Sequence, residues 1–149
     1  MKIPAILVVA LGIAAWSAPG HAECWEDAAA RYGINAYLLH AIAKTESGLN
    51  PRAINRNKNG TYDIGLMQIN SSWFPTLRKY GITEEHLYDP CTSIHVGAWI
   101  LAQNMQRLGN SWTAVGAYNS GKPDLRLKYA QKVYKNLPPA LRTASQAEE

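Results

Sequence analysis

Two carboxylates, Glu46 and Asp63, are candidates for chemistry because their sequence surroundings differ. Glu46 ends a segment with helical apolar periodicity and falls on its apolar side. Burial there, and the partial negative charge of a helix C-terminus, should raise the pKa of Glu46 and keep it protonated near neutral pH. Asp63 stands among asparagine and threonine residues in a polar hairpin and should stay ionised. Such a pair suits glycosidic bond cleavage, with one carboxyl as acid and the other as charge stabiliser or nucleophile.

The elements that would position these carboxylates are mostly short helices. Asn35 can cap the helix that carries Glu46, and Gly48 with Pro51 ends it. Asn59-Gly60 is a strong hairpin signal between two short strands that contain Asp63. We predict helices at 24–32, 36–46, 75–80, 83–86, 93–108, 112–118 and 124–136, and a loop or short turn at 65–68. The strands at 53–57 and 61–64 should belong to a small polar β element of two or three strands. This pattern predicts a mostly α member of the α+β class.

The chain of 149 residues begins with the pattern of a secretory signal peptide. A positive start and an apolar run over 3–16 precede the small residues Gly20 and Ala22, so cleavage is expected after Ala22. The alternative, a membrane anchor, is disfavoured because a span needs roughly 20 apolar residues. No stable membrane insertion is expected once the signal peptide is removed. We expect one domain over 23–137, without repeats, and a polar, disordered tail over 138–149.

Composition narrows the function classes. The formal net charge of +4 is mild, and no basic–aromatic run indicates nucleic acid binding. Cys24 and Cys91 both follow the signal peptide, so they could form a disulfide or remain two buried thiols, and export favours the disulfide. Two cysteines and four scattered histidines give no metal-ligand spacing, and no cofactor is expected. The alternative to a catalytic role is a structural one, in which Glu46 is solvated and Asp63 only stabilises the turn.

Three ordered motifs carry a family resemblance. Glu46-Ser47, Gly-Leu-Met-Gln at 65–68 and Ala-Tyr-Asn-Ser-Gly at 117–121 resemble the motif series of the soluble-lytic-transglycosylase-like domain. The resemblance implies a lysozyme-like fold with a small β-hairpin beside the active-site cleft. It also implies a monomeric periplasmic enzyme that acts on peptidoglycan glycan strands. The size of the chain and its cysteine pair resemble those of the specialised members that are associated with type III or type IV secretion or conjugation systems. This resemblance implies that a component of such a system is a partner.

The resemblance implies roles for individual residues. Glu46 would be the single acid/base that cleaves the β-1,4 bond between N-acetylmuramic acid and N-acetylglucosamine, leaving a 1,6-anhydro end. Ser47 would orient the acid or the substrate's acetamido group. Met67 and Gln68 would line the glycan groove, Tyr118 and Asn119 would approach Glu46 from the opposite wall, and Tyr129 would hydrogen-bond near the acid. Leu125-Arg126 stands where the family usually has Glu-Thr before that tyrosine.

A second resemblance involves Asp63. Asp63-Ile64 stands where the transglycosylases commonly carry a serine and one further residue. The run from Glu46 to Asn70 is also similar to C-type lysozymes, whose second carboxylate follows the first by the same interval. That resemblance implies that Asp63 stabilises or traps the oxocarbenium ion, with Asn57 and Asn70 steering it or the sugar. The alternatives are therefore a lysozyme-like hydrolase and, from another class, a wall-binding module without turnover.

Overall fold

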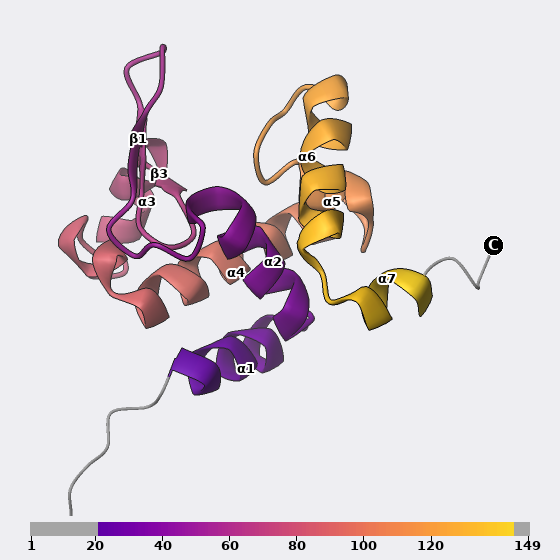
Figure 1. Ribbon diagram of the computed structural model, residues 1–149. Coiled ribbons are helices and arrows are strands. Elements are labelled where there is room, and N and C mark those ends of the chain that lie inside the picture. Colours follow the sequence, from indigo (N-terminus) through magenta and orange to yellow (C-terminus); the bar gives the residue numbers. More distant parts are fainter. Residues whose placement is uncertain (1–20, 145–149) are drawn as a thin grey trace, which may run out of the picture.

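Helices and one small antiparallel sheet make up the fold, as the sequence predicts. The computed structural model describes residues 21–144 (Figure 1). Its elements, with η marking 3-10 helices, are α1 (His21–Tyr32), α2 (Ala36–Ser47), β1 (Ile54–Arg56), β2 (Tyr62–Ile64), β3 (Ile69–Asn70), η1 (Ser71–Trp73), α3 (Phe74–Arg78), η2 (Glu85–Tyr88), α4 (Pro90–Leu108), α5 (Trp112–Gly116), α6 (Pro123–Asn136) and α7 (Pro139–Ala144). The predicted mostly α class with a hairpin is confirmed.

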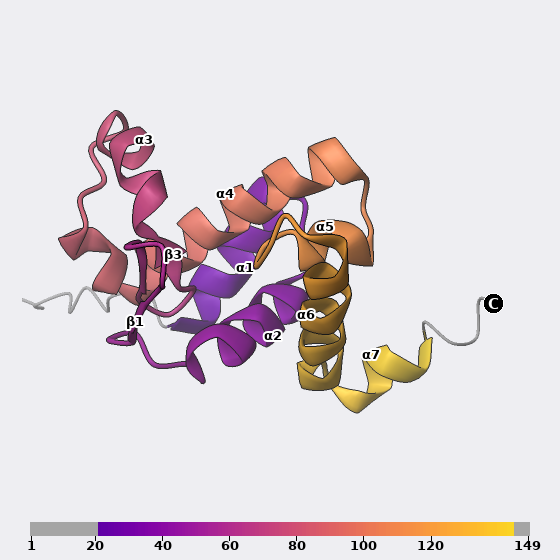
Figure 2. The same ribbon diagram turned by 90° about the horizontal axis from the view of Figure 1, so that it is seen from above.

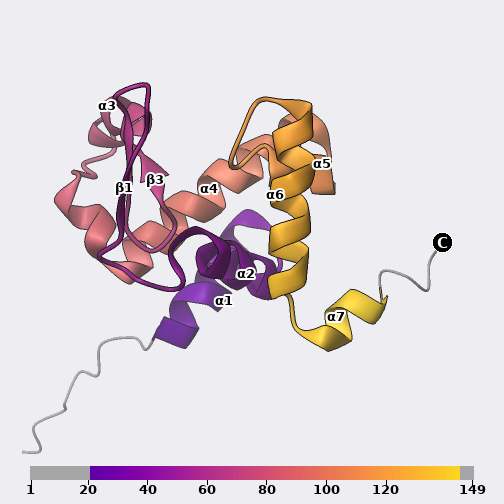
Figure 3. The same ribbon diagram turned by 45° about the horizontal axis from the view of Figure 1, so that its top comes forward.

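The elements form two groups joined by a central pair of helices. In Figures 1 and 2 the sheet and α3 lie on one side, α5 and α6 lie on the other, and α2 and α4 lie between them. Helix α2 packs against α6, and α4 packs against α1 and α5. The end of α2 therefore lies where the two groups face each other (Figure 3).

Helix α2 begins and ends as the sequence predicts. The Asn35 side chain accepts a hydrogen bond from the Tyr37 N–H at 2.8 Å, which satisfies one of the free donors of the first turn. Gly48 adopts φ 61° at the other end and donates its N–H to the Lys44 carbonyl. A glycine accepts this left-handed conformation at little cost, so the helix ends at Ser47.

The sheet has the strand order β1-β2-β3, all antiparallel. The predicted hairpin joins β1 to β2, and its turn is closed by the Asn57 N–H donating to the Thr61 carbonyl at 2.8 Å. Strand β3 is the third strand of the predicted two- or three-stranded element: Ile64 pairs with Ile69, and both are buried. This pairing directs one face of β2 into the core and leaves Asp63 on the other face.

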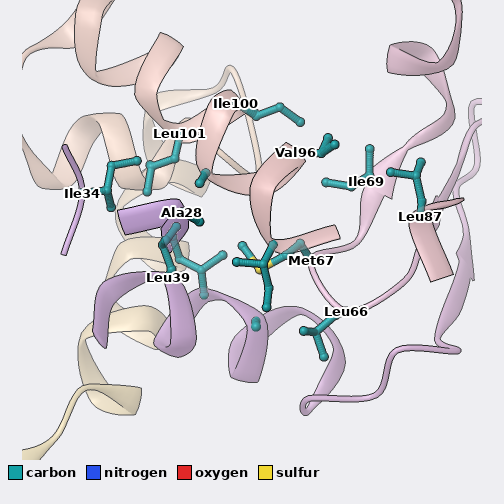
Figure 4. Packing of buried hydrophobic residues seen from close by; sticks show 14 of the residues in the cluster. Ala28, Ile34, Leu39, Leu66, Met67, Ile69, Leu87, Val96, Ile100 and Leu101 are labelled. Atoms are coloured by element: carbon teal, nitrogen blue, oxygen red, sulfur yellow. The ribbon is translucent and has the colours of Figure 1, made fainter. Parts of the chain in front are cut away.

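The core lies between α1, α2, α4 and the segment that leads into β3. Three fully buried side chains lie close together in Figure 4: Leu39 of α2, Leu101 of α4, and Met67 of the segment before β3. Fully burying each such side chain contributes roughly 1.5–3 kcal/mol. The core thus fixes the end of α2 and the loop before β3 relative to each other.

The N-terminal end of α4 differs from the prediction. The helix begins at Pro90 rather than at residue 93, because Pro90 suits the first helical position and the Asp89 carboxylate accepts the Thr92 N–H at 2.8 Å. Cys91 lies in this first turn and forms a disulfide with Cys24 of α1, with 5.4 Å between the Cα atoms. The expected bridge is therefore present, and it ties α1 to α4.

The predicted disordered tail is wrong for residues 139–144, which form α7. Pro139 occupies its first position, and the Tyr134 hydroxyl of α6 donates to the Arg142 carbonyl at 2.7 Å, which holds the short helix against α6. Residues 1–20, which hold most of the expected signal peptide, and 145–149 lie outside the described part of the chain. Within residues 21–144, no helix combines the length and the apolar character that crossing a membrane requires.

Candidate active site

Glu46 lies in the last turn of α2, where α6 packs against that helix. The Tyr129 hydroxyl of α6 donates a hydrogen bond of 2.5 Å to Oε1 of Glu46. Further along the same helix pair, the Asn136 amide donates to the Thr45 hydroxyl at 2.9 Å. These two bonds set the position of α6 along α2 and so fix the orientation of the carboxyl.

The surroundings of Glu46 favour its protonated form. Burial is the largest influence and raises the pKa of Glu46 to about 7. The Tyr129 hydrogen bond lowers this pKa, the negative charge of Asp63 raises it, and the positive charge of Lys132 lowers it. Burial at the apolar side of the helix end thus raises the pKa of this carboxyl, as the sequence predicted.

Two tyrosines form one wall beside Glu46. The rings of Tyr118 and Tyr129 are stacked, with centroids 6.5 Å apart and planes 15° apart. The Tyr118 hydroxyl donates to the Met67 carbonyl at 2.9 Å. Burial, with the Glu46 charge next in size, raises the pKa of both phenols, so each stays a hydrogen-bond donor.

Two amide side chains hold Asp63, one from the turn after β1 and one from β3. Asn57 donates to Oδ2 at 2.9 Å, and Asn70 donates to Oδ1 at 2.8 Å. The same two amides also donate to the Thr61 hydroxyl, each at 3.1 Å. Asn57 and Asn70 therefore orient the Asp63 carboxylate, which accepts one N–H on each oxygen as an ionised carboxyl can. This is the position that the lysozyme resemblance implied for them.

The Gly-Leu-Met-Gln segment is a tight turn between β2 and β3. Gly65 has φ 77°, and a Cβ there would lie 2.2 Å from the Leu87 carbonyl oxygen, so no side chain fits. Gln68 also has a positive φ of 52°. Its amide nitrogen donates to the carbonyls of Ala53 and Gly65, and its oxygen accepts from Asn55 at 2.7 Å. Gln68 thus fixes the turn as well as bordering the site.

A cavity of about 220 Å³ brings most of the predicted residues together. Its lining residues come from α2, the sheet and its turns, η1, α4 and the segment after α5: Glu46, Asn57, Asp63, Gln68, Ile69, Asn70, Trp73, Ile100, Tyr118 and Asn119. Both carboxylates border one space, and Tyr118 with Asn119 lies across from the sheet residues, as the family resemblance implied.

Two predicted groove residues lie elsewhere. Met67 is fully buried beneath the cavity and contributes its carbonyl to Tyr118, because its side chain packs where Gly97 leaves room. The prediction that Met67 lines the groove is therefore wrong. The Ser47 hydroxyl donates to the Leu66 carbonyl at 2.7 Å and joins α2 to the turn, outside the cavity lining. Tyr129 also lies outside the lining but contacts Glu46 directly.

Three residues that line the cavity, Ile69, Trp73 and Ile100, were not predicted from the sequence. Trp73 carried a usable signal, because a tryptophan in a short polar segment just after Asn70 does not fit a core helix pattern. The two isoleucines cannot be told from ordinary core residues. Among residues 21–144 no cluster of three or more His, Cys, Asp or Glu side chains could hold a metal ion. The polar side chains that border the cavity are two carboxyls, four amides and the Tyr118 phenol.

Comparisons with known proteins agree with this arrangement. Residues 23–137 match the model of the transglycosylase SLT domain. The chain is 48% identical over 120 residues to invasion protein IagB of Salmonella typhimurium, covering 77% of this chain and 75% of that protein. It is 44% identical over 135 residues to protein IpgF of Shigella flexneri, covering 87% of each.

A solved structure extends the comparison to the fold. An inactive mutant of the lytic transglycosylase Slt from Pseudomonas aeruginosa matches with a TM-score of 0.64 and 25% identity, over 78% of this chain. The match spans only 23% of that longer protein. The shared part is the lysozyme-like fold that carries the cavity. The chain therefore belongs to the transglycosylase SLT domain family and is a peptidoglycan lytic transglycosylase with a lysozyme-like fold.

Proposed function

We propose that Glu46 is the single acid/base of a transglycosylation that cleaves the bond between N-acetylmuramic acid and N-acetylglucosamine. One observation carries this assignment: a buried carboxyl with a pKa of about 7 borders a polar cavity. A group with that pKa is protonated often enough to act as an acid and ionised often enough to act as a base near neutral pH.

The reaction then needs one proton shuttled in both directions. Glu46 donates its proton to the glycosidic oxygen as the bond to C1 of the muramic acid breaks. The resulting carboxylate removes the proton of the C6 hydroxyl of the same sugar, and that oxygen bonds to C1. The product ends in 1,6-anhydromuramic acid, no water is consumed, and Glu46 regains its proton.

The neighbouring side chains support this cycle. The Tyr129 hydrogen bond orients Glu46 and stabilises its ionised form between the two proton transfers. Asp63, oriented by Asn57 and Asn70, places negative charge where positive charge develops at C1. Asn119 borders the same cavity and offers its amide to the sugar's polar groups, whereas both amide N–H groups of Gln68 are already donated within the turn.

A lysozyme-like hydrolysis is the second candidate, and Asp63 is the observation that favours it. Its oriented carboxylate borders the same cavity as Glu46, as a nucleophile or ion stabiliser would. Digestion of purified cell wall followed by mass spectrometry distinguishes the two. Transglycosylation gives muropeptides that are lighter by one water than hydrolytic products. Reducing ends alone would overturn the transglycosylase outcome.

Two variants test the roles of the carboxylates. Glu46→Gln should reduce the rate of cell-wall clearance by about 10²–10⁴-fold, because the proton donor is lost. Clearance at the wild-type rate would show that Glu46 is not the acid. A wild-type chain that binds cell wall without clearing it would instead support a wall-binding module without turnover. Asp63→Asn keeps the size of the side chain and should reduce the rate markedly if its charge stabilises the ion. A rate close to wild type would show that the substrate's acetamido group suffices.

We also propose that the enzyme works in the periplasm, after export directed by residues 1–22, and opens the wall locally for a secretion or conjugation apparatus. The 48% identity to a protein named invasion protein IagB supports a role beside such a machine. In a strain that lacks this chain, the wild-type sequence should restore transport by the apparatus and Glu46→Gln should not. Equal restoration by both would show that wall cleavage is not the contribution.

A further inference from the structure

The loop between α5 and α6 carries two residues of the catalytic cavity, Tyr118 and Asn119. In Figure 3 this loop runs along the side of α6 that faces the sheet. Tyr118 is anchored to the turn before β3, since its hydroxyl donates to the Met67 carbonyl at 2.9 Å. Asn119 is exposed, and its backbone N–H donates to the Gly116 carbonyl at 3.2 Å. The position of the Asn119 amide therefore depends on what holds the other end of the loop.

Arg126, near the beginning of α6, holds that end. Its Nε donates to the Ser120 carbonyl at 3.0 Å, and the side chain is half-buried. The start of the loop meets the same residue, because a Cβ at Gly116 would lie 2.6 Å from the Cβ of Arg126. A hydrogen bond from a charged donor is stronger than a neutral backbone bond, and the Ser120 N–H bond to the Gly116 carbonyl is long at 3.3 Å. Asn119 thus lies between two fixed points, the Tyr118 hydroxyl and the Ser120 carbonyl.

We propose that Arg126 is a positioning residue: by fixing the Ser120 carbonyl, it holds the Asn119 amide against the sugar in the catalytic cavity. The inference rests on the proposed function, in which Asn119 offers its amide to that sugar. Arg126 is one of the two residues, Leu125-Arg126, that stand where the family usually has Glu-Thr. It does not line the cavity, so it acts on the sugar through the loop. Its loss should weaken substrate binding and leave proton transfer by Glu46 intact.

Arg126→Met and Arg126→Gln separate the hydrogen bond from the charge. Both remove the positive charge and keep an unbranched side chain. The glutamine nitrogen is attached to Cδ, as the arginine Nε is, so glutamine can still donate to the Ser120 carbonyl, whereas methionine cannot. In assays of anhydromuropeptide release from soluble glycan strands, Arg126→Met should raise KM about three- to tenfold and keep kcat within about twofold of wild type. Arg126→Gln should keep KM close to the wild-type value.

The pH profile distinguishes positioning of the loop from a general loosening of α6. Tyr129 lies one turn further along this helix and donates to Glu46, so a displaced helix would move the alkaline limb of kcat/KM. Arg126→Met should leave that limb in place. Lys128→Met is the matched control, because it removes a positive charge from an exposed position of α6 outside the cavity lining, and KM should not change. A displaced limb in Arg126→Met, or an equal rise of KM in Lys128→Met, would overturn the inference.

A double-mutant cycle with Asn119→Ala tests whether Arg126 acts through the Asn119 amide. Asn119→Ala alone should raise KM, and adding Arg126→Met should raise it little further, because the amide to be positioned is gone. Effects that multiply would show that Arg126 acts independently, against the inference. If Asn119→Ala raises KM and Arg126→Met does not, the inference fails and the proposed sugar contact stands. If Asn119→Ala leaves KM unchanged, both fail, and release of anhydro products by the wild-type chain still shows whether the reaction proposed for Glu46 stands.

Discussion

Tyr129→Phe isolates the contribution of one hydrogen bond to the acidity of Glu46. The phenol donates to the carboxyl at 2.5 Å, and this bond opposes the effect of burial. A hydrogen bond to a charged group contributes about 1.5–3 kcal/mol, and one pKa unit corresponds to 1.36 kcal/mol. Its removal should therefore raise the pKa of Glu46 from about 7 to about 8 or 9.

The assay is the pH profile of kcat/KM for release of anhydromuropeptides. Activity falls at high pH as the acid loses its proton, so the alkaline limb should move upward by the same one to two pH units. Carbon NMR of the labelled Glu46 carboxyl measures the same pKa without turnover.

Tyr118→Phe is the control for this change. It removes a hydroxyl that bonds to the Met67 carbonyl and leaves the bond to Glu46 in place, so it should not move the limb. A limb that stays near pH 7 or moves downward in Tyr129→Phe would show that this hydrogen bond does not lower the pKa of Glu46.

The remaining predictions concern stability. Because the folded-state pKa of Glu46 lies above its unfolded value of about 4.3, wild-type stability should fall by about 3 kcal/mol between pH 4 and pH 7, and Glu46→Gln should flatten this slope in urea titrations. Cys24→Ser removes the disulfide that joins residues 67 positions apart, so the free energy of unfolding measured in urea should fall by about 4 kcal/mol. Reducing agent should not lower the stability of that variant further. Gly97→Ala would place a methyl group 2.6 Å from Met67 Cε and 2.9 Å from the Tyr118 hydroxyl, so its melting temperature should fall with a cost of about 1–3 kcal/mol. An unchanged melting temperature would show that these side chains move aside freely.

Local patterns in the sequence were sufficient for the helix that carries Glu46 and for the hairpin that carries Asp63. Caps, the Asn-Gly turn and apolar periodicity all act within a few residues, so they can be recognised without the fold. The raised pKa of Glu46 could be predicted for the same reason, since burial at the apolar side of α2 is its main cause.

Features that depend on contacts between residues far apart in the sequence could not be predicted from local patterns. The Tyr129 hydrogen bond joins residues 83 positions apart, and only a family resemblance pointed to it. Met67 was placed in the groove by the same resemblance, whereas its side chain packs beneath Gly97. Trp73 borders the cavity because β3 pairs with β2, and that pairing has no local signal in a two-residue strand.

The disulfide between α1 and α4 makes the enzyme's folding depend on the compartment in which it resides. If the Cys24–Cys91 bridge contributes about 4 kcal/mol, forming it changes the ratio of folded to unfolded chains nearly a thousandfold. Thiols stay reduced in the cytosol and pair in oxidising compartments. A chain able to cut the cell wall would thus acquire its full stability only after it has left the cell interior that made it.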